Sequence, residues 1–172
     1  MKTKPLWEST RDLHHACEEH PVGNAMSKGN PPRIWYKAWL MALYQIHSAV
    51  DPHVPESIER AKRLFKDLQS MDEEPEVKPL SEAAKYAQTL KTEKTIAGAA
   101  YVLTGAHLMG GEIMRRRLEG FPTLHLEWDD RKEALAVLQT FRTRDDITEE
   151  SRDCFQALLN VMDEIQSLYN IV

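Results

Sequence analysis

The chain has 172 residues, 42% of them hydrophobic and 28% charged, which is the size and composition of one globular domain. A net charge of −5 excludes the basic footprint of a nucleic-acid-binding protein, and two cysteines are too few for a disulfide framework. No apolar stretch is long enough for a membrane span, and the N-terminus lacks the apolar run of a signal peptide. We therefore expect a soluble, cytoplasmic, single domain over residues 1–172.

Apolar residues recur at helical spacing through nearly every long segment, and strand-like alternation is hard to find. The first predicted helix carries Leu6, Leu13 and Cys17 on one stripe, and a glycine- and asparagine-containing loop is expected over residues 23–30. The later predicted helices cover about residues 34–50, 55–70, 80–90, 92–118, 129–143 and 148–169, with a connector at 71–79 and a loop at 119–128. The predicted fold is an all-α bundle of about seven helices.

Two of these helices have unusual sequences. The helix over 34–50 is apolar almost all round, which indicates a central buried helix, and it ends before Pro52. The helix over 92–118 contains the pair Gly110-Gly111, and each glycine costs about 1 kcal/mol of helix stability relative to alanine. Such a pair indicates a kink, or a close approach of the backbone to a neighbouring helix or a flat ligand.

The first helix carries the most suggestive polar pair. His14 lies four residues before Glu18, so the two side chains share a face, and the carboxylate could orient a metal-bound imidazole. The same spacing also describes an ordinary exposed helix pair. Cys17 lies three residues from His14, but without an oxyanion-binding device we expect a small buried side chain there and no nucleophile.

Several segments, taken in order, resemble the heme oxygenases. Residues 10–18, TRDLHHACE, are similar to the first-helix signature of that family, in which a Thr lies four residues before the proximal His and a Glu four after it. The resemblance continues through the rest of the chain. Residues 36–51 are similar to the family's second helix, and residues 99–101 with 108–113 are similar to its distal helix. Residues 141–144 resemble the aromatic and basic segment at the heme propionates, and residues 154–165 follow the pattern of the closing helix. It covers nearly the whole chain, which is somewhat shorter than typical members.

The resemblance implies a helical domain that holds heme b between its first and fifth helices. His14 would be the proximal iron ligand, Glu18 would orient it, and the guanidinium fork of Arg142 would pair with a propionate. The implied site is, in full, catalytic His107, Gly110 and Gly111, and cofactor-binding His14, Glu18, Tyr101, Met109, Arg142 and Arg144. Such enzymes use heme as substrate and cofactor, with O2 and electrons from a reductase or ferredoxin, and yield biliverdin, CO and ferrous iron.

Two departures from the family pattern bear on the activity. The family's distal segment reads Gly-Asp-Leu-Ser-Gly-Gly, and His107 stands here in place of the Asp that holds water for proton delivery. Trp7 stands where a propionate-binding lysine is common, with Lys2 and Lys4 as nearby substitutes.

Three outcomes follow from the distal substitution. His107 could hold water and preserve ring oxygenation, because an imidazole can relay protons near neutral pH. It could instead bind iron as a second axial ligand, giving a non-catalytic bis-histidine protein for storage, sensing or electron transfer. Alternatively the chain could bind no heme and serve as a scaffold for a protein partner. A non-heme diiron oxidase ranks lowest, because only His14, Glu18, His107 and Glu112 are at hand as ligands.

Overall fold

The computed structural model describes residues 4–170 and shows a single all-α domain, which confirms the predicted fold class. Its α-helices are α1 (Leu6–Glu19), α2 (Pro21–Lys28), α3 (Arg33–Val50), α4 (Ala61–Gln69), α5 (Ser81–Ala87), α6 (Glu93–Gly105), α7 (Gly111–Arg117), α8 (Arg131–Arg142) and α9 (Thr148–Leu168). Shorter turns are η1 (Asp51–His53), η2 (Glu56–Ile58), η3 (Ala106–Gly110) and η4 (Leu124–Leu126). In the described part of the chain, no helix has the length and apolar character to cross a membrane.

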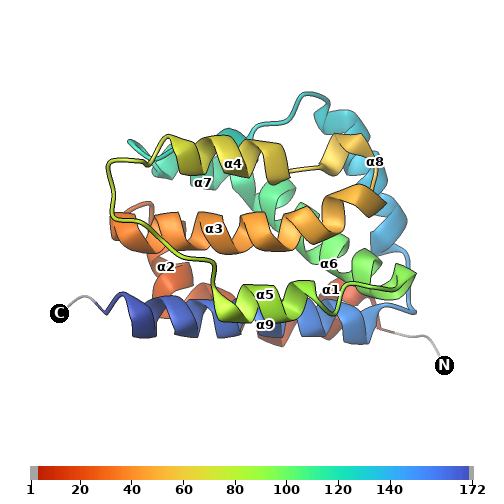
Figure 1. Cartoon of the computed structure of the whole chain (residues 1–172). Helices are drawn as coiled ribbons and strands as arrows, with labels where there is room; N and C mark the ends of the chain where they lie inside the picture. The colour runs from red at the N-terminus through yellow and green to blue at the C-terminus, as the bar shows by residue number, and fades with distance from the viewer. Residues whose placement is uncertain (1–3, 171–172) are drawn as a thin grey trace.

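Helix α3 is the centre of the bundle, as its apolar sequence predicts. It runs across the middle of the molecule between α4 on one side and α5 with α9 on the other (Figure 1). Its side chains Tyr36, Leu40, Leu43 and Ile46 are fully buried. Burying a side chain of this size contributes about 1.5–3 kcal/mol each, so α3 anchors the hydrophobic core.

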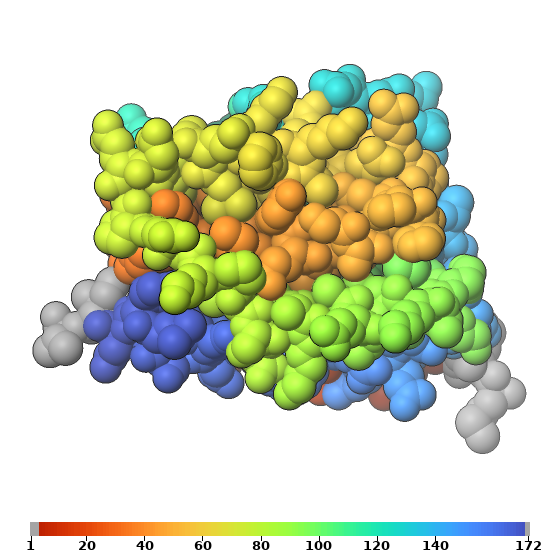
Figure 2. All heavy atoms as spheres, in the orientation of Figure 1, coloured from red at the N-terminus to blue at the C-terminus, as the bar shows by residue number. Residues whose placement is uncertain are grey.

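Figure 2 shows the side chains of α3 in a band between those of α4 and those of α5, filling the spaces between the ribbons. Polar contacts fix α5 in place. Gln45 of α3 exchanges two hydrogen bonds with the backbone of Leu80, and the carboxylate of Glu164 on α9 accepts from the backbone N–H groups of Ser81 and Glu82. Glu164 therefore caps α5 from another helix, which supplies the anion that a helix N-terminus favours.

The expected loop over residues 23–30 was wrong, because α2 occupies most of it. The ring Nδ1 of His20 accepts a hydrogen bond from the backbone N–H of Val22, and Pro21 occupies the first turn, where its missing N–H costs nothing. Gly29 ends α2 with a φ of 81°, in the left-handed region that favours glycine. The glycine and asparagine of this segment were therefore compatible with a short, well-capped helix.

The helix predicted over 55–70 begins later, at Ala61. The cause is Asp51, whose carboxylate Oδ2 accepts from the backbone N–H groups of Arg60 and Ala61 at 2.9 and 2.7 Å. This contact fixes the start of α4 beside the end of α3, and the intervening residues form the two short turns η1 and η2.

The helix predicted over 92–118 is present as α6, η3 and α7 in direct succession. The middle piece η3 is a π-helical turn, which inserts an extra residue into the helical ladder and is frequent at functional sites. The glycine pair lies at the junction of η3 and α7, where the sequence indicates a change in backbone geometry.

Candidate functional site

The imidazole of His14 lies on the outer face of α1 with its side chain 54% exposed. Its Nε2 lies 3.5 Å from Glu18 Oε1, so the predicted pair is present, and its ring packs edge-on against Phe155 of α9 at 5.9 Å between centroids. Because Nε2 is the nitrogen nearest Glu18, the ring would have to turn about its Cβ–Cγ bond to offer Nε2 to a metal and Nδ1 to the carboxylate. In an exposed side chain this rotation costs little.

An exposed apolar face runs along η3 and α7. Ala106, Met109, Gly110 and Ile113 all lie on it, and Met109 and Ile113 are 50% and 57% exposed, which is high for apolar side chains. A Cβ placed on Gly110 would meet no atom within 4 Å, so the backbone there is open to an incoming group. Gly111, by contrast, packs against Leu126. The two glycines of the predicted pair therefore have different surroundings.

Helix α1 and the exposed face of η3–α7 are linked only through neighbouring helices, at two places in the described residues. At one, Thr10 of α1 lies beside the Tyr101 hydroxyl of α6. At the other, the guanidinium of Arg117 on α7 donates to the backbone carbonyl of Ser27 on α2 at 3.0 Å. Within residues 4–170 no side-chain hydrogen bond or ion pair links α1 to η3 or α7.

The predicted propionate-binding residues divide into two kinds. Arg142 is exposed and lies near Tyr101, whose pKa is raised by burial, while Thr10 and Arg142 oppose this effect. Arg144 is already paired with Glu93 and Asp146, and hydrogen bonds to these carboxylates raise its pKa. Arg142 is therefore the guanidinium that is available for an added carboxylate.

At the N-terminal end of α1, Trp7 and Lys4 are both exposed. Lys2 lies outside the described residues. Of the two lysines suggested for propionate binding, Lys4 is therefore the one within the described residues, and it lies near the start of the helix that carries His14.

His107 points into the core, and only 6% of its surface is exposed. Its Nε2 lies 3.2 Å from the Nε2 of His47 on α3, and its ring meets His125 of η4 edge-to-face with 5.6 Å between centroids. The three imidazoles come from segments far apart in the sequence and form one buried row, which we call the histidine row (His47, His107 and His125).

A carboxylate binds each end of the histidine row. His47 Nδ1 lies 3.3 Å from Asp51 Oδ1, and His125 Nδ1 lies 2.7 Å from Asp67 Oδ2. Asp67 also accepts from the backbone N–H groups of Leu124 and His125, both at 3.0 Å. These contacts make Asp51 and Asp67 structural acceptors as well as partners of the imidazoles.

One buried cation lies beside the histidine row. The guanidinium of Arg60 lies 3.7 Å above the ring of Trp128 and donates to the carbonyl of His125 at 3.3 Å. Burial lowers the pKa of His107 well below its usual value, and the neighbouring imidazoles and Arg60 lower it further. Burial also lowers the pKa of His125, although its hydrogen bond to Asp67 acts in the opposite direction. Both imidazoles are therefore neutral at neutral pH.

Sequence reasoning missed this cluster. Of the three imidazoles, only His107 was a candidate from the sequence, and the structure buries His47 and His125 beside it. The available signal was Asp51, four residues after His47 on the same helical face of an otherwise apolar helix.

The remaining reactive groups offer no second centre. Burial raises the pKa of Cys17, which is partly buried, to about 11 and that of the buried Cys154 to about 12, so both are protonated thiols at neutral pH. Within residues 4–170 no group of three or more His, Cys, Asp and Glu side chains is placed to hold a metal ion. The diiron alternative therefore has no ligand set in this part of the chain.

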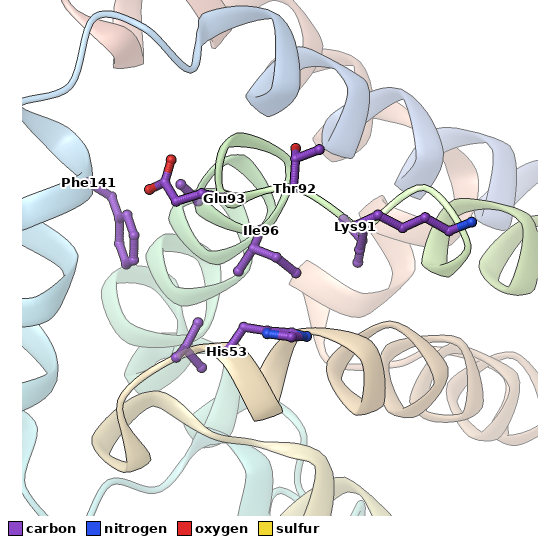
Figure 3. A pocket seen from close by; sticks show the side chains of 9 residues that line it. His53, Lys91, Thr92, Glu93, Ile96 and Phe141 are labelled. Carbon is purple, nitrogen blue, oxygen red and sulfur yellow. The ribbon is translucent and has the colours of Figure 1, made fainter.

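A pocket of about 330 Å³ lies at the start of α6, between η1 and the end of α8. Figure 3 shows Phe141, Ile96 and His53 around it, with the Lys91 side chain extending away. None of the predicted site residues lines this pocket, and its volume is at the lower limit for a small-molecule site. We therefore base the candidate site on the exposed faces of α1 and η3–α7.

The arrangement of helices defines the class of fold, which is that of the heme oxygenases. Heme oxygenase from Leptospira interrogans has a TM-score of 0.78 and 20% identity, over 92% of this chain and 97% of that one. Heme oxygenase-1 from the cyanobacterium Synechocystis, in complex with heme, has a TM-score of 0.80 and 20% identity, over 95% of this chain and 91% of that one. Heme oxygenase-2 from Synechocystis, in complex with heme and NO, has a TM-score of 0.74 and 23% identity, over 95% and 84%.

In sequence, no family model and no curated protein matches the chain. At 20–23% identity the likeness to solved structures establishes the fold and leaves the activity to be argued from the residues.

Proposed function

We propose that this chain binds heme b between α1 and η3–α7, with His14 as the iron ligand, and cleaves it oxidatively to biliverdin, CO and ferrous iron. The observation that carries this proposal is that α1 exposes an imidazole and that η3–α7 exposes a glycine-bearing apolar face. The shared fold supports it, because two of the similar solved structures contain heme.

The residues present fit a flat, largely apolar ligand with charged edges. Open space at Gly110 and the exposed side chains of Met109 and Ile113 suit one face of a porphyrin, and an imidazole suits its iron. Arg142, exposed beside Tyr101, provides a guanidinium for a carboxylate edge.

In this proposal each residue has a limited task. Heme, when bound, supplies both the iron that activates O2 and the ring that is oxidised, with electrons from a reductase or ferredoxin. Glu18 orients His14, Arg142 and Tyr101 hold the propionate edge, and Met109 with Gly110 limits the distal space. His107 remains neutral and can hold water by hydrogen bonding at the inner side of that space.

The structure bears on the choice between the enzyme and a bis-histidine heme protein. A second axial ligand would have to reach the iron, and the imidazole of His107 is held in the core by the contact of its Nε2 with His47. This contact favours the form in which one side of the iron stays open to O2.

Heme titration of matched variants tests the proposal. We expect the wild type to bind one heme, and His14→Ala to lose the axial ligand and bind it at least tenfold more weakly. His15→Ala is the matched control, because His15 is equally exposed and also lies beside Glu18. Turnover with ascorbate or a reductase should then produce biliverdin absorbance in the wild type. A wild-type protein that takes up no heme would contradict the proposal and favour the scaffold for a protein partner.

A further inference from the structure

The contacts of His47 determine which ring nitrogens of the histidine row carry protons. Asp51 Oδ2 accepts hydrogen bonds from two backbone N–H groups, and Asp51 Oδ1 lies 3.3 Å from His47 Nδ1. With Asp51 Oδ1 as the acceptor, His47 Nδ1 is the donor of this hydrogen bond. An imidazole with a single ring proton that donates from Nδ1 has an unprotonated Nε2, and the lone pair of this Nε2 is directed at His107.

The same reasoning fixes His107. Its Nε2 lies 3.2 Å from the Nε2 of His47 and has to donate to it, so the proton of His107 is on Nε2 and its Nδ1 is unprotonated. Burial beside His125 and Arg60, which disfavours a second proton on this ring, supports the neutral form. The hydrogen bond points inward from η3, whereas the preceding residue, Ala106, lies on the exposed face.

We propose that His47, fixed by Asp51, is the positioning residue that holds the His107 imidazole in the core with its proton on Nε2, and so keeps it from becoming a second iron ligand. This inference rests on the proposed heme site. In this inference His47 of α3, which lies behind η3, determines whether the iron has one histidine ligand and an open distal side or two histidine ligands.

The first test uses the protein without heme. In ¹⁵N-histidine NMR spectra we expect the shifts of His107 to show protonated Nε2 and unprotonated Nδ1, and this signature to be lost in His47→Ala. His53→Ala is the control, because His53 is exposed and lies outside the row. A proton on His107 Nδ1 would overturn the inference. So would a stoichiometric divalent metal bound by the wild type and lost in His47→Ala, because the two Nε2 atoms would then be metal ligands.

The second test reads the ferric heme complex by visible and electron paramagnetic resonance spectroscopy. We expect a high-spin wild type, a shift to low spin in His47→Ala, and a return to high spin in the His47→Ala/His107→Ala double variant. His47→Gln, whose side-chain oxygen can accept from His107, should restore the wild-type spectrum and guards against loss of folding. A low-spin wild type, or an unchanged spectrum in His47→Ala, would overturn the inference. Absence of heme uptake would refute the proposed function, while the NMR signature would still decide whether His47 orients His107.

Discussion

Asp67 gives the sharpest test of how the fold holds the histidine row. Its side chain is buried and accepts three hydrogen bonds, from the backbone N–H groups of Leu124 and His125 and from the His125 ring. Asp67→Ala leaves these three donors without their partner, two of them fully buried and the N–H of Leu124 partly buried. Each such loss costs about 1–3 kcal/mol, so the loss of one acceptor for three donors costs about 3 kcal/mol or more in total. For a domain of this size, that corresponds to a fall in Tm of roughly 10 °C.

The assay is thermal and urea unfolding of the wild type and two variants. Asp129→Ala is the matched control, because Asp129 also forms one carboxylate pair, with Arg63, but its side chain is 94% exposed. We expect no measurable change in Tm for that variant, because exposed ion pairs contribute little. If Asp67→Ala unfolds within about 2 °C of the wild type, the argument that Asp67 anchors η4 to α4 is refuted.

Two further predictions concern acid stability and the glycines. The pKa values of His107 and His125 are lowered in the folded state, so the unfolded chain binds more protons below pH 6.5. The free energy of unfolding should therefore fall on acidification from pH 7 to 5.5, by up to about 1.4 kcal/mol per pH unit for each imidazole. A urea midpoint that stays constant over this range would contradict the prediction. Gly110→Ala should raise the Tm of the heme-free protein by a few degrees, because its Cβ meets no atom and alanine favours helix, and should weaken heme binding. Gly98→Ala should lower the Tm, because its Cβ would lie 2.6 Å from Glu150 Cβ; equal Tm shifts would refute both.

The sequence is sufficient to predict the helices that carry a strong apolar stripe. The all-α class, α3 as the central helix and the succession α6–η3–α7 follow from periodicity and from the glycine pair. The starts of α2 and α4 did not follow, because distant or irregular groups set them. His20 caps α2 with a ring nitrogen, and Asp51 caps α4 from the end of α3. Contacts of this kind leave no periodic signal in a single sequence.

The candidate site shows the same division. The pairing of His14 with Glu18 is local to one helix and could be predicted from spacing. The histidine row could not, because His47, His107 and His125 come from three elements that meet only when α4 and η4 pack against α3 and η3. Sequence reasoning considered the substitution at His107 in isolation, whereas in the folded chain it has two imidazole neighbours.

The charges around His107 explain why an imidazole suits this buried position better than a carboxylate would. Asp51 and Asp67 already place two carboxylates at the histidine row, against the single guanidinium of Arg60. His107→Asp would bury a third carboxylate there, at a cost of several kcal/mol unless a neighbouring imidazole takes up a proton.

That requirement reverses the pH dependence of stability. In the wild type, neutral buried imidazoles make the protein less stable as the pH falls below 6.5. In His107→Asp, the added carboxylate favours the charged imidazole of His125 and raises its folded pKa. Stability is then fully present below the unfolded value near 6.5 and is lost as the pH rises through the folded value. Urea midpoints at pH 5.5 and 8 should therefore change in opposite directions in the two proteins, with His107→Asn as the uncharged control. If His107→Asp has the wild-type slope, the imidazoles do not respond to the added charge, and the electrostatic account of this substitution fails.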